Sequence, residues 1–473
     1  MKRFYFIGIG GTAMAAVAAA LRNRGDDVLG SDSTLYPPTS TFLDLHGIPY
    51  HQGFDENNIY QLASDALVIV GNAVGRGNPE VEALLNTRRQ YTSLPELIRA
   101  ELISEKQSLV VAGTHGKTTT TSLTAWTLDV AGLSPGFLIG GIPKNFGSGC
   151  RLSIDGGIFV TEGDEYDTAF FDKRSKFLHY RPEIAIINNV EFDHADMFDN
   201  LAQVKRAFTH FVNLVPGNGL IIVNGDDIQA MDVVKNAHTP ILEIGLGFSN
   251  VLRARDLRLI NGRTAFTVLD RRNSSYQRFS IPMAGEFNVR NALCALAAAR
   301  HLGIDDATIQ HAFDGFLGVN RRMEVLAEYD GITVIDDFAH HPTALNATLT
   351  ALREKYPDRR LLACFDPRSN TTTRSIYQNE IAEALSLADI AVIGAIDRPH
   401  RYREHERFSP EQAVHELETR GVIARTIPEP SEMVDWVMNV VRSGDVIALC
   451  SNGQFGGVGE SISTRLRERI GKH

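Results

Sequence analysis

The chain is organised around Val110-Val111-Ala112-Gly113-Thr114-His115-Gly116-Lys117-Thr118-Thr119-Thr120-Thr121-Ser122. Residues 108–112 form a short apolar run that predicts a buried strand, and residues 122–130 continue as a helix. The turn between them is bounded by glycines and ends in Gly-Lys-Thr. It gathers backbone N–H groups, a helix N-terminus and the Lys117 ammonium around one point, which suits a polyphosphate. The Thr118 hydroxyl is placed to ligate an accompanying Mg²⁺.

This turn departs from the usual phosphate-loop spacing. The pattern G-x-x-x-x-G-K-S/T requires a glycine at position 111, where Val111 stands, and the first glycine is Gly113. A glycine-rich turn that only packs well is the alternative interpretation. Lys117 and Thr118 nevertheless follow Gly116 at the required offsets, between a strand and a helix. The sequence therefore predicts a nucleotide phosphate site of a shortened type.

Length, charge and cysteine usage bound the class of protein. A chain of 473 residues is long enough for two to four domains. The net charge of −10 argues against a nucleic-acid partner, and no apolar run approaches the ~20 residues that span a membrane. The cysteines are spread far apart without a C-x-x-C pair, at Cys150, Cys294, Cys364 and Cys450. We expect core thiols in a cytoplasmic protein.

The first segment predicts a βαβ unit. A strand over residues 3–8 leads into Gly8-Ile9-Gly10-Gly11-Thr12, then a helix and a second strand over residues 27–30 that ends at Ser31-Asp32. This pattern is close to the dinucleotide-binding fingerprint, although adjacent glycines replace its spaced last pair. A Rossmann-like turn without a ligand is the alternative. Asp32 suits a ribose or sugar hydroxyl, or a cap on the next turn. A strand over residues 66–71 then delivers a loop rich in Gly and Asn, where ligands bind in α/β sheets.

Acidic residues follow two strands of the second segment. A strand over residues 158–161 delivers Glu162-Gly163-Asp164-Glu165-Tyr166-Asp167, and a strand over residues 184–188 delivers a loop that contains Asp193-His194. In a doubly wound sheet both loops lie at the same edge as the phosphate turn. Carboxylates and an imidazole beside Thr118 make a plausible set of Mg²⁺ ligands. Residues 170–177 set three cations among aromatic residues, either as a solvated loop or as a reader of substrate carboxylates.

Alternating strands and helices return after residue 320 and predict a second parallel α/β sheet. Its strands end in residues 336–342, 366–370 and 451–457, three polar loops on one functional face. A metal site at His340-His341 is an option, although adjacent histidines seldom chelate one ion. We predict an α/β protein of three domains: a Rossmann-like domain over residues 1–106, a central P-loop-type ATP-binding domain over 107–318 and a Rossmann-like domain over 319–473.

This architecture, with Gly113-Thr114-His115-Gly116-Lys117-Thr118-Thr119 opening the central domain, resembles the ATP-dependent Mur ligases of bacterial cell-wall synthesis. Residues 8–12 and 336–342 resemble the branch of that family that adds L-alanine to UDP-N-acetylmuramate. Other stretches are more similar to the branch that recycles UDP-N-acetylmuramate with a tripeptide, namely residues 31–32, 71–83, 170–182, 191–198, 366–371 and 451–457. The resemblance spans the whole chain.

The resemblance implies ATP-driven amide formation. The lactyl carboxylate of UDP-N-acetylmuramate takes the γ-phosphoryl group of ATP, and the amine of L-alanyl-γ-D-glutamyl-meso-diaminopimelate displaces phosphate. No covalent enzyme nucleophile is needed, so the enzyme positions two anions and neutralises their charge. The implied cofactors are ATP and Mg²⁺, the implied partners are the two small-molecule substrates, and neither a nucleic acid nor a membrane is involved. The sequence does not indicate an oligomeric state.

The resemblance also implies site roles. The ATP-binding residues would be Gly113, Thr114, His115, Gly116, Lys117, Thr118, Thr119, Asn291, Arg322 and Asp336. The UDP-sugar residues would be Gly8, Gly10, Gly11, Thr12, Ser31, Asp32 and Asn72. The amino substrate would meet His340, His341 and Arg368, with Lys173, Arg174 and Lys176 as further candidates. Thr118 and Glu162 would hold one Mg²⁺ and His194 a second, so the catalytic set is Lys117, Glu162 and His194.

Some assignments stay open. Whether Glu162 or Glu165 is the metal ligand is not settled by spacing, and Phe287 stands where the family commonly has a polar residue next to the adenine. Three rivals remain: an L-alanine-adding ligase, which residues 170–176 disfavour, a non-catalytic UDP-sugar or nucleotide sensor on the same fold, and a Rossmann dehydrogenase.

Overall fold

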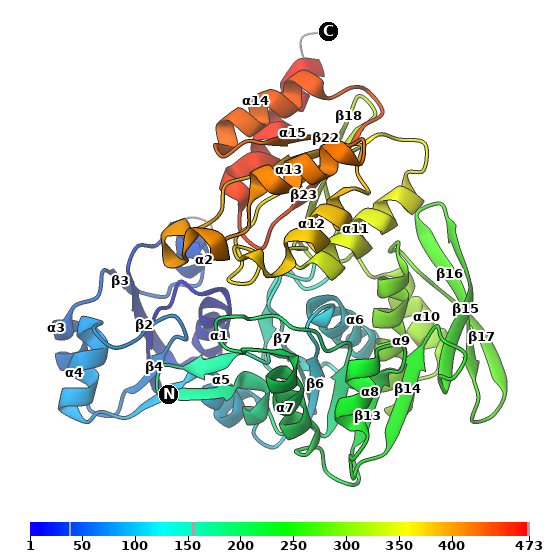
Figure 1. Cartoon of the computed structure of the whole chain (residues 1–473). Coiled ribbons are helices and arrows are strands. Elements are labelled where there is room, and N and C mark those ends of the chain that lie inside the picture. The colour runs from blue at the N-terminus through cyan, green and yellow to red at the C-terminus, as the bar shows by residue number, and fades with distance from the viewer. Residues whose placement is uncertain (37–38, 154–156, 471–473) are drawn as a thin grey trace.

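The computed structural model describes residues 1–36, 39–153 and 157–470. Three α/β units follow one another along this part of the chain, each built on its own main sheet (Figure 1). In Figure 1 the N-terminal domain lies at the lower left, the central domain at the lower right and the C-terminal domain above both. The predicted α/β class and three-domain architecture are confirmed.

The N-terminal domain is a five-stranded parallel sheet in the order β3-β2-β1-β4-β5. Because parallel strands end at one edge, the turns after β1, β2 and β4 lie together there. Its elements are β1 (Arg3–Ile7), α1 (Thr12–Asn23), β2 (Asp27–Asp32), α2 (Thr39–Leu45), β3 (Tyr50–Gln52), α3 (Glu56–Tyr60), β4 (Leu67–Val70), α4 (Pro79–Thr87), β5 (Tyr91–Ser93), α5 (Leu94–Leu97) and the π-helix η1 (Ile98–Ile103).

The central domain has a ten-stranded sheet in the order β17-β16-β15-β14-β13-β12-β6-β9-β7-β8. The strands β12 and β9 flank β6 in parallel, so their acidic loops share the edge of the phosphate turn, as predicted. The elements are β6 (Gln107–Ala112), α6 (Lys117–Val130), β7 (Gly136–Leu138), β8 (Cys150–Arg151), β9 (Ile158–Gly163), β10 (Asp167–Ala169), β11 (Asp172–Ser175), η2 (Lys176–His179), β12 (Ile184–Ile187), α7 (Leu201–Val212), β13 (Leu220–Asn224), α8 (Ile228–Val234), β14 (Ile241–Gly245), β15 (Leu252–Ile260), β16 (Arg263–Asp270), β17 (Ser275–Ile281), α9 (Glu286–His301) and α10 (Asp306–Asp314).

The C-terminal domain is a six-stranded sheet in the order β18-β19-β23-β20-β21-β22, parallel except for the edge strand β18. Its elements are β18 (Glu324–Tyr329), β19 (Ile332–Asp337), α11 (Pro342–Lys355), β20 (Leu361–Phe365), η3 (Ser375–Tyr377), α12 (Gln378–Leu385), β21 (Ile390–Ile393), η4 (Pro399–Arg401), η5 (Glu404–Glu406), α13 (Pro410–Thr419), β22 (Ile423–Thr426), α14 (Pro430–Val440), β23 (Val446–Cys450), η6 (Phe455–Gly457) and α15 (Val458–Ile470).

Three local expectations need correction. Helix α6 begins at Lys117, five residues before the predicted start, because its threonine run is buried and helical despite β-branching. Helix α9 likewise begins at Glu286 rather than Asn291. The strand β2 continues through Asp32, so Ser31 and Asp32 belong to the strand and point to opposite faces of the sheet.

The two outer domains are joined to the central one by different chemistry. One apolar cluster contains residues of both the N-terminal and central domains, such as Ile98 and Leu102 of η1 with Phe177 and Tyr180. The C-terminal domain has apolar clusters of its own. All four cysteines are free and buried, as expected. Within the described ranges, no helix is both long and apolar enough to cross a membrane.

Candidate functional site

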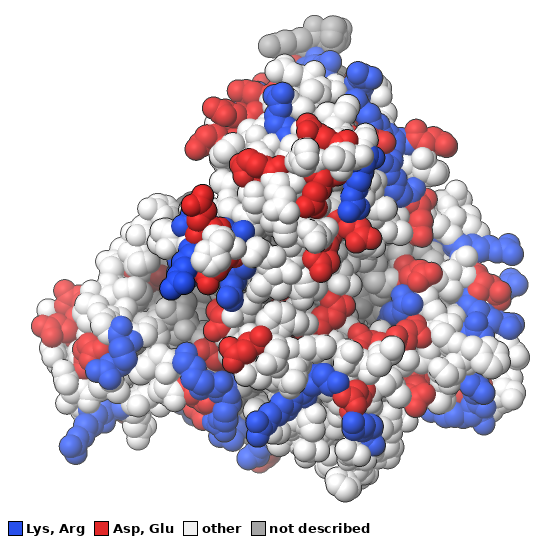
Figure 2. Space-filling model, in the orientation of Figure 1, with Lys and Arg blue, Asp and Glu red and all other residues white. Residues whose placement is uncertain are grey.

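A cavity of about 1790 Å³ lies where the three domains meet. It is larger than the ~300–1,000 Å³ of a typical small-molecule site, which suits more than one substrate. Its walls include the loops at the carboxyl ends of parallel strands in all three sheets, where α/β folds bind ligands. On the face shown in Figure 2, acidic and basic side chains are interspersed rather than gathered into one basic surface.

The phosphate turn is built by two glycines in left-handed conformations. Gly113 has φ +142° and Gly116 has φ +80°. A Cβ atom at Gly116 would lie 2.6 Å from Asn291 Oδ1 and 2.8 Å from Asn188 Nδ2, so only glycine fits there. Lys117 is the first residue of α6, and its Nζ donates to the Gly113 carbonyl oxygen at 2.8 Å. The ammonium thus lies over the turn that the sequence predicts to hold phosphate.

Two carboxylates at the end of β9, Glu162 and Glu165, contact different residues around this turn. Glu162 accepts hydrogen bonds from the Thr118 hydroxyl at 3.1 Å and from the Gly140 N–H at 2.6 Å. Glu165 accepts from Lys117 Nζ at 2.9 Å, and its other oxygen lies 3.3 Å from His194 Nε2. Both acids therefore face the phosphate turn: Glu162 beside the hydroxyl, as predicted, and Glu165 between the lysine and the histidine.

The charges in this cluster depend on one another. Burial lowers the pKa of the Lys117 ammonium, but Glu165 and Asp164 outweigh it and the net shift is upward. Burial likewise opposes the charged form of His194, but the ion pair with Glu165 raises its pKa to about 9. Burial and the neighbouring Asp164 raise the pKa of Glu162. Lys117 is thus held as a cation, and the imidazolium of His194 takes the place of a second cation.

His194 lies in a strained turn after β12. Its φ of +53° is unusual for a side chain that is not glycine, and such strain collects at functional sites. The same loop braces the phosphate turn, because Asn189 Oδ1 accepts from the His115 N–H at 2.7 Å. From this turn the imidazole lies 3.3 Å from Glu165 Oε1.

The donor set at this point fits Mg²⁺. The Glu165 oxygen that lies 3.3 Å from His194 Nε2 is buried and forms no well-directed hydrogen bond, so it keeps a lone pair for a cation. The Thr118 hydroxyl and the carboxylates are hard oxygen donors, which Mg²⁺ prefers, and the His194 imidazole stands beside them. Thr118 and Glu162, predicted to share one ion, are in contact, and His194, predicted for a second ion, contacts Glu165.

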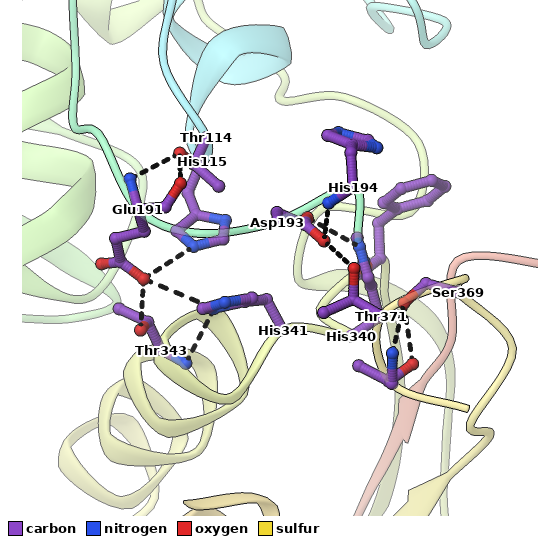
Figure 3. Close-up of polar contacts among 12 residues, drawn as sticks. Thr114, His115, Glu191, Asp193, His194, His340, His341, Thr343, Ser369 and Thr371 are labelled. Atoms are coloured by element: carbon purple, nitrogen blue, oxygen red, sulfur yellow. Dashed lines mark hydrogen bonds and ion pairs between the residues drawn. The ribbon is translucent and has the colours of Figure 1, made fainter. Parts of the chain in front are cut away.

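The C-terminal domain closes on this cluster through polar contacts. The Arg322 guanidinium donates to the Thr118 hydroxyl at 2.9 Å. The Thr371 hydroxyl donates to Asp193 Oδ1 at 2.6 Å, and the Tyr377 hydroxyl donates to the Phe192 carbonyl oxygen at 2.7 Å. Figure 3 shows the loop after β12 facing His340, His341 and Thr371 of the C-terminal domain. These contacts place the arginine predicted for the γ-phosphate at the phosphate turn.

The N-terminal turn is fixed by hydrogen bonds from its own backbone N–H groups. The N–H groups of Gly8 and Ile9 donate to the Ser31 carbonyl oxygen at 2.8 and 3.0 Å. The Gly10 N–H donates to Asp32 Oδ2 at 2.8 Å, so the acid predicted for a sugar hydroxyl also fixes the turn. The N-terminus of α1 follows directly and favours an anion.

Most predicted site residues line the cavity. They are Gly8, Gly11, Thr12, Asp32, Asn72, Thr114, His115, Gly116, Lys117, Thr118, Thr119, Glu162, His194, Asn291, Arg322, His340 and Arg368. Five predicted residues are not among its lining: Gly10, Ser31, Gly113, Asp336 and His341.

Physical reasons explain three of these five. The Ser31 hydroxyl is fully buried and donates to Glu80 Oε2 at 2.5 Å, on the opposite face of β2 from Asp32. Asp336 pairs with Arg321 at 3.0 Å. His341 caps α11 and faces the central domain.

Sequence reasoning missed or misplaced several residues near the site. Residues 170–175 form the turn and second strand of the hairpin of β10 and β11, and residues 176–177 begin η2, so the stretch is not one loop. Lys173 is exposed and pairs with Asp167, whereas Lys176 lines the cavity with its ammonium 3.9 Å from the Tyr166 ring centre. The link from Asp193 to Thr371 joins positions 178 apart in the chain, so no local signal marked it.

Comparison with known proteins decides the family. The Mur ligase family catalytic domain matches residues 3–106, the Mur ligase middle domain matches 111–299 and the Mur ligase glutamate ligase domain matches 321–453. Over 99% of its length the chain is 40% identical to the whole of the UDP-N-acetylmuramate–L-alanyl-γ-D-glutamyl-meso-2,6-diaminoheptandioate ligase of Haemophilus influenzae. This chain belongs to the Mur ligase family.

Other Mur ligases are similar at full length. A murein peptide ligase of Psychrobacter arcticus is 34% identical in its crystal structure, with a TM-score of 0.75 over 98% of this chain and 99% of that one. The UDP-N-acetylmuramate–L-alanine ligase of Persephonella marina is 32% identical over all of this chain and 98% of its own. The resemblance inferred from the motifs is confirmed at the level of the family.

Proposed function

We propose that this Mur ligase uses ATP to join the carboxylate of UDP-N-acetylmuramate to the amine of L-alanyl-γ-D-glutamyl-meso-diaminopimelate. The observation that carries the ligase chemistry is the single cavity in which the phosphate turn, the N-terminal glycine turn and the C-terminal domain all meet. The tripeptide acceptor is supported by the name of the Haemophilus relative, which is 40% identical, against 32% for the L-alanine ligase of Persephonella.

The residues of the central domain carry phosphoryl transfer in this proposal. Lys117 and the first N–H groups of α6 bind and orient the β- and γ-phosphates, with Arg322 approaching from the C-terminal domain. Thr118 and Glu162 would hold one Mg²⁺ and His194, beside Glu165, a second, and these ions would supply charge neutralisation between the anionic phosphate and carboxylate. A carboxylate oxygen attacks the γ-phosphorus and ADP leaves, giving an acyl phosphate.

Amide formation follows in the same enclosed space. The substrate amine attacks the acyl carbon, and the tetrahedral intermediate expels inorganic phosphate. Arg368 and His340 line the cavity on the side of the C-terminal domain and are our candidates for the amino substrate. Because burial lowers the pKa of His340, its imidazole is neutral near neutral pH. Closure of the C-terminal domain excludes water that would otherwise hydrolyse the acyl phosphate.

The domain boundaries and the compartment complete the proposal. We place the boundaries after residues 106 and 318, since η1 ends at Ile103 before β6 and α10 ends at Asp314 before β18. A cytoplasmic location is supported by four buried thiols, which suit a reducing compartment.

An acceptor screen tests the function directly. Phosphate release is measured with ATP, Mg²⁺ and UDP-N-acetylmuramate, together with the tripeptide or L-alanine, and the product is weighed by mass spectrometry. We expect turnover with the tripeptide at least ~10²-fold above L-alanine, because about 3 kcal/mol of binding to the longer substrate is realised in the transition state.

Each other outcome has a distinct meaning. Robust turnover with L-alanine and none with the tripeptide would leave the ligase chemistry in place and overturn the acceptor. Binding of the UDP-sugar with no turnover for any acceptor would favour a sensor. If neither NAD nor NADP binds in a titration, the protein is not a Rossmann dehydrogenase.

A further inference from the structure

Three side chains that the proposed mechanism does not use as metal ligands meet between two domains. His115 belongs to the phosphate turn, Glu191 to the loop after β12 and His341 to the start of α11 in the C-terminal domain. Their ligand atoms all lie within 4.8 Å of one another. Figure 3 shows both imidazoles directed at the carboxylate. None of the three belongs to the cluster of Thr118, Glu162 and His194.

The distances match those around a tetrahedral ion. His115 Nε2 lies 3.3 Å from Glu191 Oε2, and His341 Nδ1 lies 3.4 Å from the same oxygen. Two ligand atoms bound ~2.0–2.1 Å from a tetrahedral Zn²⁺ are about 3.3–3.4 Å apart. The carboxylate oxygen thus already lies at the spacing of a zinc site from each imidazole nitrogen, and the three ligand atoms lie within 4.8 Å of one another.

The hydrogen bonds of His341 indicate that one ring nitrogen, Nδ1, is unprotonated and carries a lone pair. His341 Nε2 lies 3.3 Å from the Phe192 carbonyl oxygen, an acceptor, so Nε2 carries the proton. Nδ1 is then an acceptor, and it faces Glu191 Oε2, which is also an acceptor. Two lone pairs facing each other repel unless a proton or a cation lies between them.

The surroundings of the cluster are those of a metal ligand set. Ligating histidines usually donate their second N–H to a carbonyl, as His341 does to Phe192, and ligating carboxylates are themselves hydrogen-bonded. The Thr343 hydroxyl donates to Glu191 Oε2 at 2.7 Å. The Thr343 N–H is 3.4 Å from His341 Nδ1, a long helix cap that a cation at the lone pair would replace.

We propose that His115, Glu191 and His341 form a site for a zinc-class divalent cation that fastens the C-terminal domain to the phosphate turn. Two imidazoles and one carboxylate are a ligand set of Zn²⁺, with a fourth position left for water. The cation bridges the two domains, so it stabilises the closed arrangement. The four cysteines are buried elsewhere and do not compete for it.

Cobalt and zinc binding to the full-length protein test the site. The protein is stripped with a chelator and kept in excess Mg²⁺, which fills the oxygen-rich site. Co²⁺ is then titrated while visible absorption is recorded. We expect one equivalent with the intense bands of four-coordinate cobalt, displaced by one equivalent of Zn²⁺. A wild-type protein that shows no such bands and binds no stoichiometric Zn²⁺ overturns the proposal.

Two substitutions remove one ligand each while sparing the fold. His341→Asn deletes the imidazole but keeps a good helix cap, and Glu191→Gln keeps the shape and hydrogen bonds of the side chain. Because loss of an outer partner alone costs 10–100-fold in metal affinity, we expect either variant to bind Zn²⁺ at least ~100-fold more weakly. The Zn²⁺-dependent rise in melting temperature should disappear with it. Unchanged affinity in both variants contradicts the proposal.

A matched control comes from the other His and carboxylate group of the described residues, Glu96, Asp172 and His179. Both oxygens of Asp172 are already held by Arg174, at 2.9 and 2.7 Å. Asp172→Asn should therefore leave Zn²⁺ and Co²⁺ binding as in the wild type. Loss of the cobalt bands in this control, with retention in His341→Asn, would assign the cation to the wrong group and overturn the proposal.

Discussion

Two glycine-rich turns in this Mur ligase share a backbone design and differ in charge. Each joins an inner strand with parallel neighbours on both sides to a helix, β1 to α1 in one and β6 to α6 in the other. The turn of the central domain places Lys117 among Glu162, Glu165 and Asp164. The turn of the N-terminal domain carries no cation of its own and is fixed by Asp32.

The difference matches two kinds of phosphate ligand. A γ-phosphoryl group that is to be transferred needs a cation and a metal, because charge moves in the transition state. A diphosphate that is only held needs N–H groups and a helix N-terminus. In the proposed function, the side chains around the two turns therefore separate a reacting site in the central domain from an anchoring site in the N-terminal domain.

The largest expected effect is the loss of turnover on removing the central cation. Lys117→Met should lower the rate of phosphate release by ~10²–10³-fold or more, because the γ-phosphate loses its fixed positive charge. Binding of the UDP-sugar should stay within about threefold, since it uses the other turn. Turnover and calorimetric binding measure the two effects separately.

A second lysine controls for the loss of charge. Lys235→Met removes an exposed ammonium from the end of α8, where it pairs only with Asp232. We expect no change in turnover for that variant. If Lys117→Met loses UDP-sugar binding as strongly as turnover, the two turns do not act independently. The separation into a reacting turn and an anchoring turn would then be wrong.

An intermediate effect concerns the pH dependence of stability. Without Mg²⁺ and in a chelator, His194 has its pKa raised from 6.5 to about 9 by Glu165, against the effect of burial. A raised pKa means that the ion pair stabilises fully below pH 6.5 and is lost as the pH rises through about 9. Since 31% of the side chain is exposed, the loss should be on the order of 1–2 kcal/mol.

Thermal unfolding of the metal-free protein across that range measures the loss. His194→Asn should flatten the slope, because Asn tolerates the left-handed backbone at this position but does not titrate. If the stability of the variant still falls with pH over this range, a group other than His194 loses the proton. The N-terminal turn has no comparable ion pair, so the effect belongs to the central site.

The sequence predicted the buried strands better than the helix starts. Strands β20, β21 and β23 lie where their apolar runs place them, since a strand covered on both faces reads as a continuous hydrophobic segment. Helix α6 started earlier than expected because its first turn is set by the tertiary site around Lys117, not by propensity.

The site residues that could be predicted are those marked by a motif or strand end in the neighbouring sequence. Lys117, Thr118 and Glu162 are marked by spacing and strand ends, and all three line the cavity. Glu165 was harder, because both carboxylates follow the same strand and only the folded loop turns one towards His194. The contact of Thr371 with Asp193 depends on how two domains close, which no local pattern records.

The smallest expected effect tests the correction at Ser31 against its neighbour Asp32. Asp32→Asn weakens the acceptor that fixes the Gly10 N–H and faces the cavity, so UDP-sugar binding should weaken by about tenfold. Ser31→Ala removes only the bond to buried Glu80. It should cost about 1 kcal/mol of stability, because Glu80 still accepts from Tyr5 and Asn58, while the KM for the UDP-sugar stays within about twofold. A Ser31→Ala variant that loses UDP-sugar binding as Asp32→Asn does would return Ser31 to the anchoring site and show that strand alternation does not separate the two side chains.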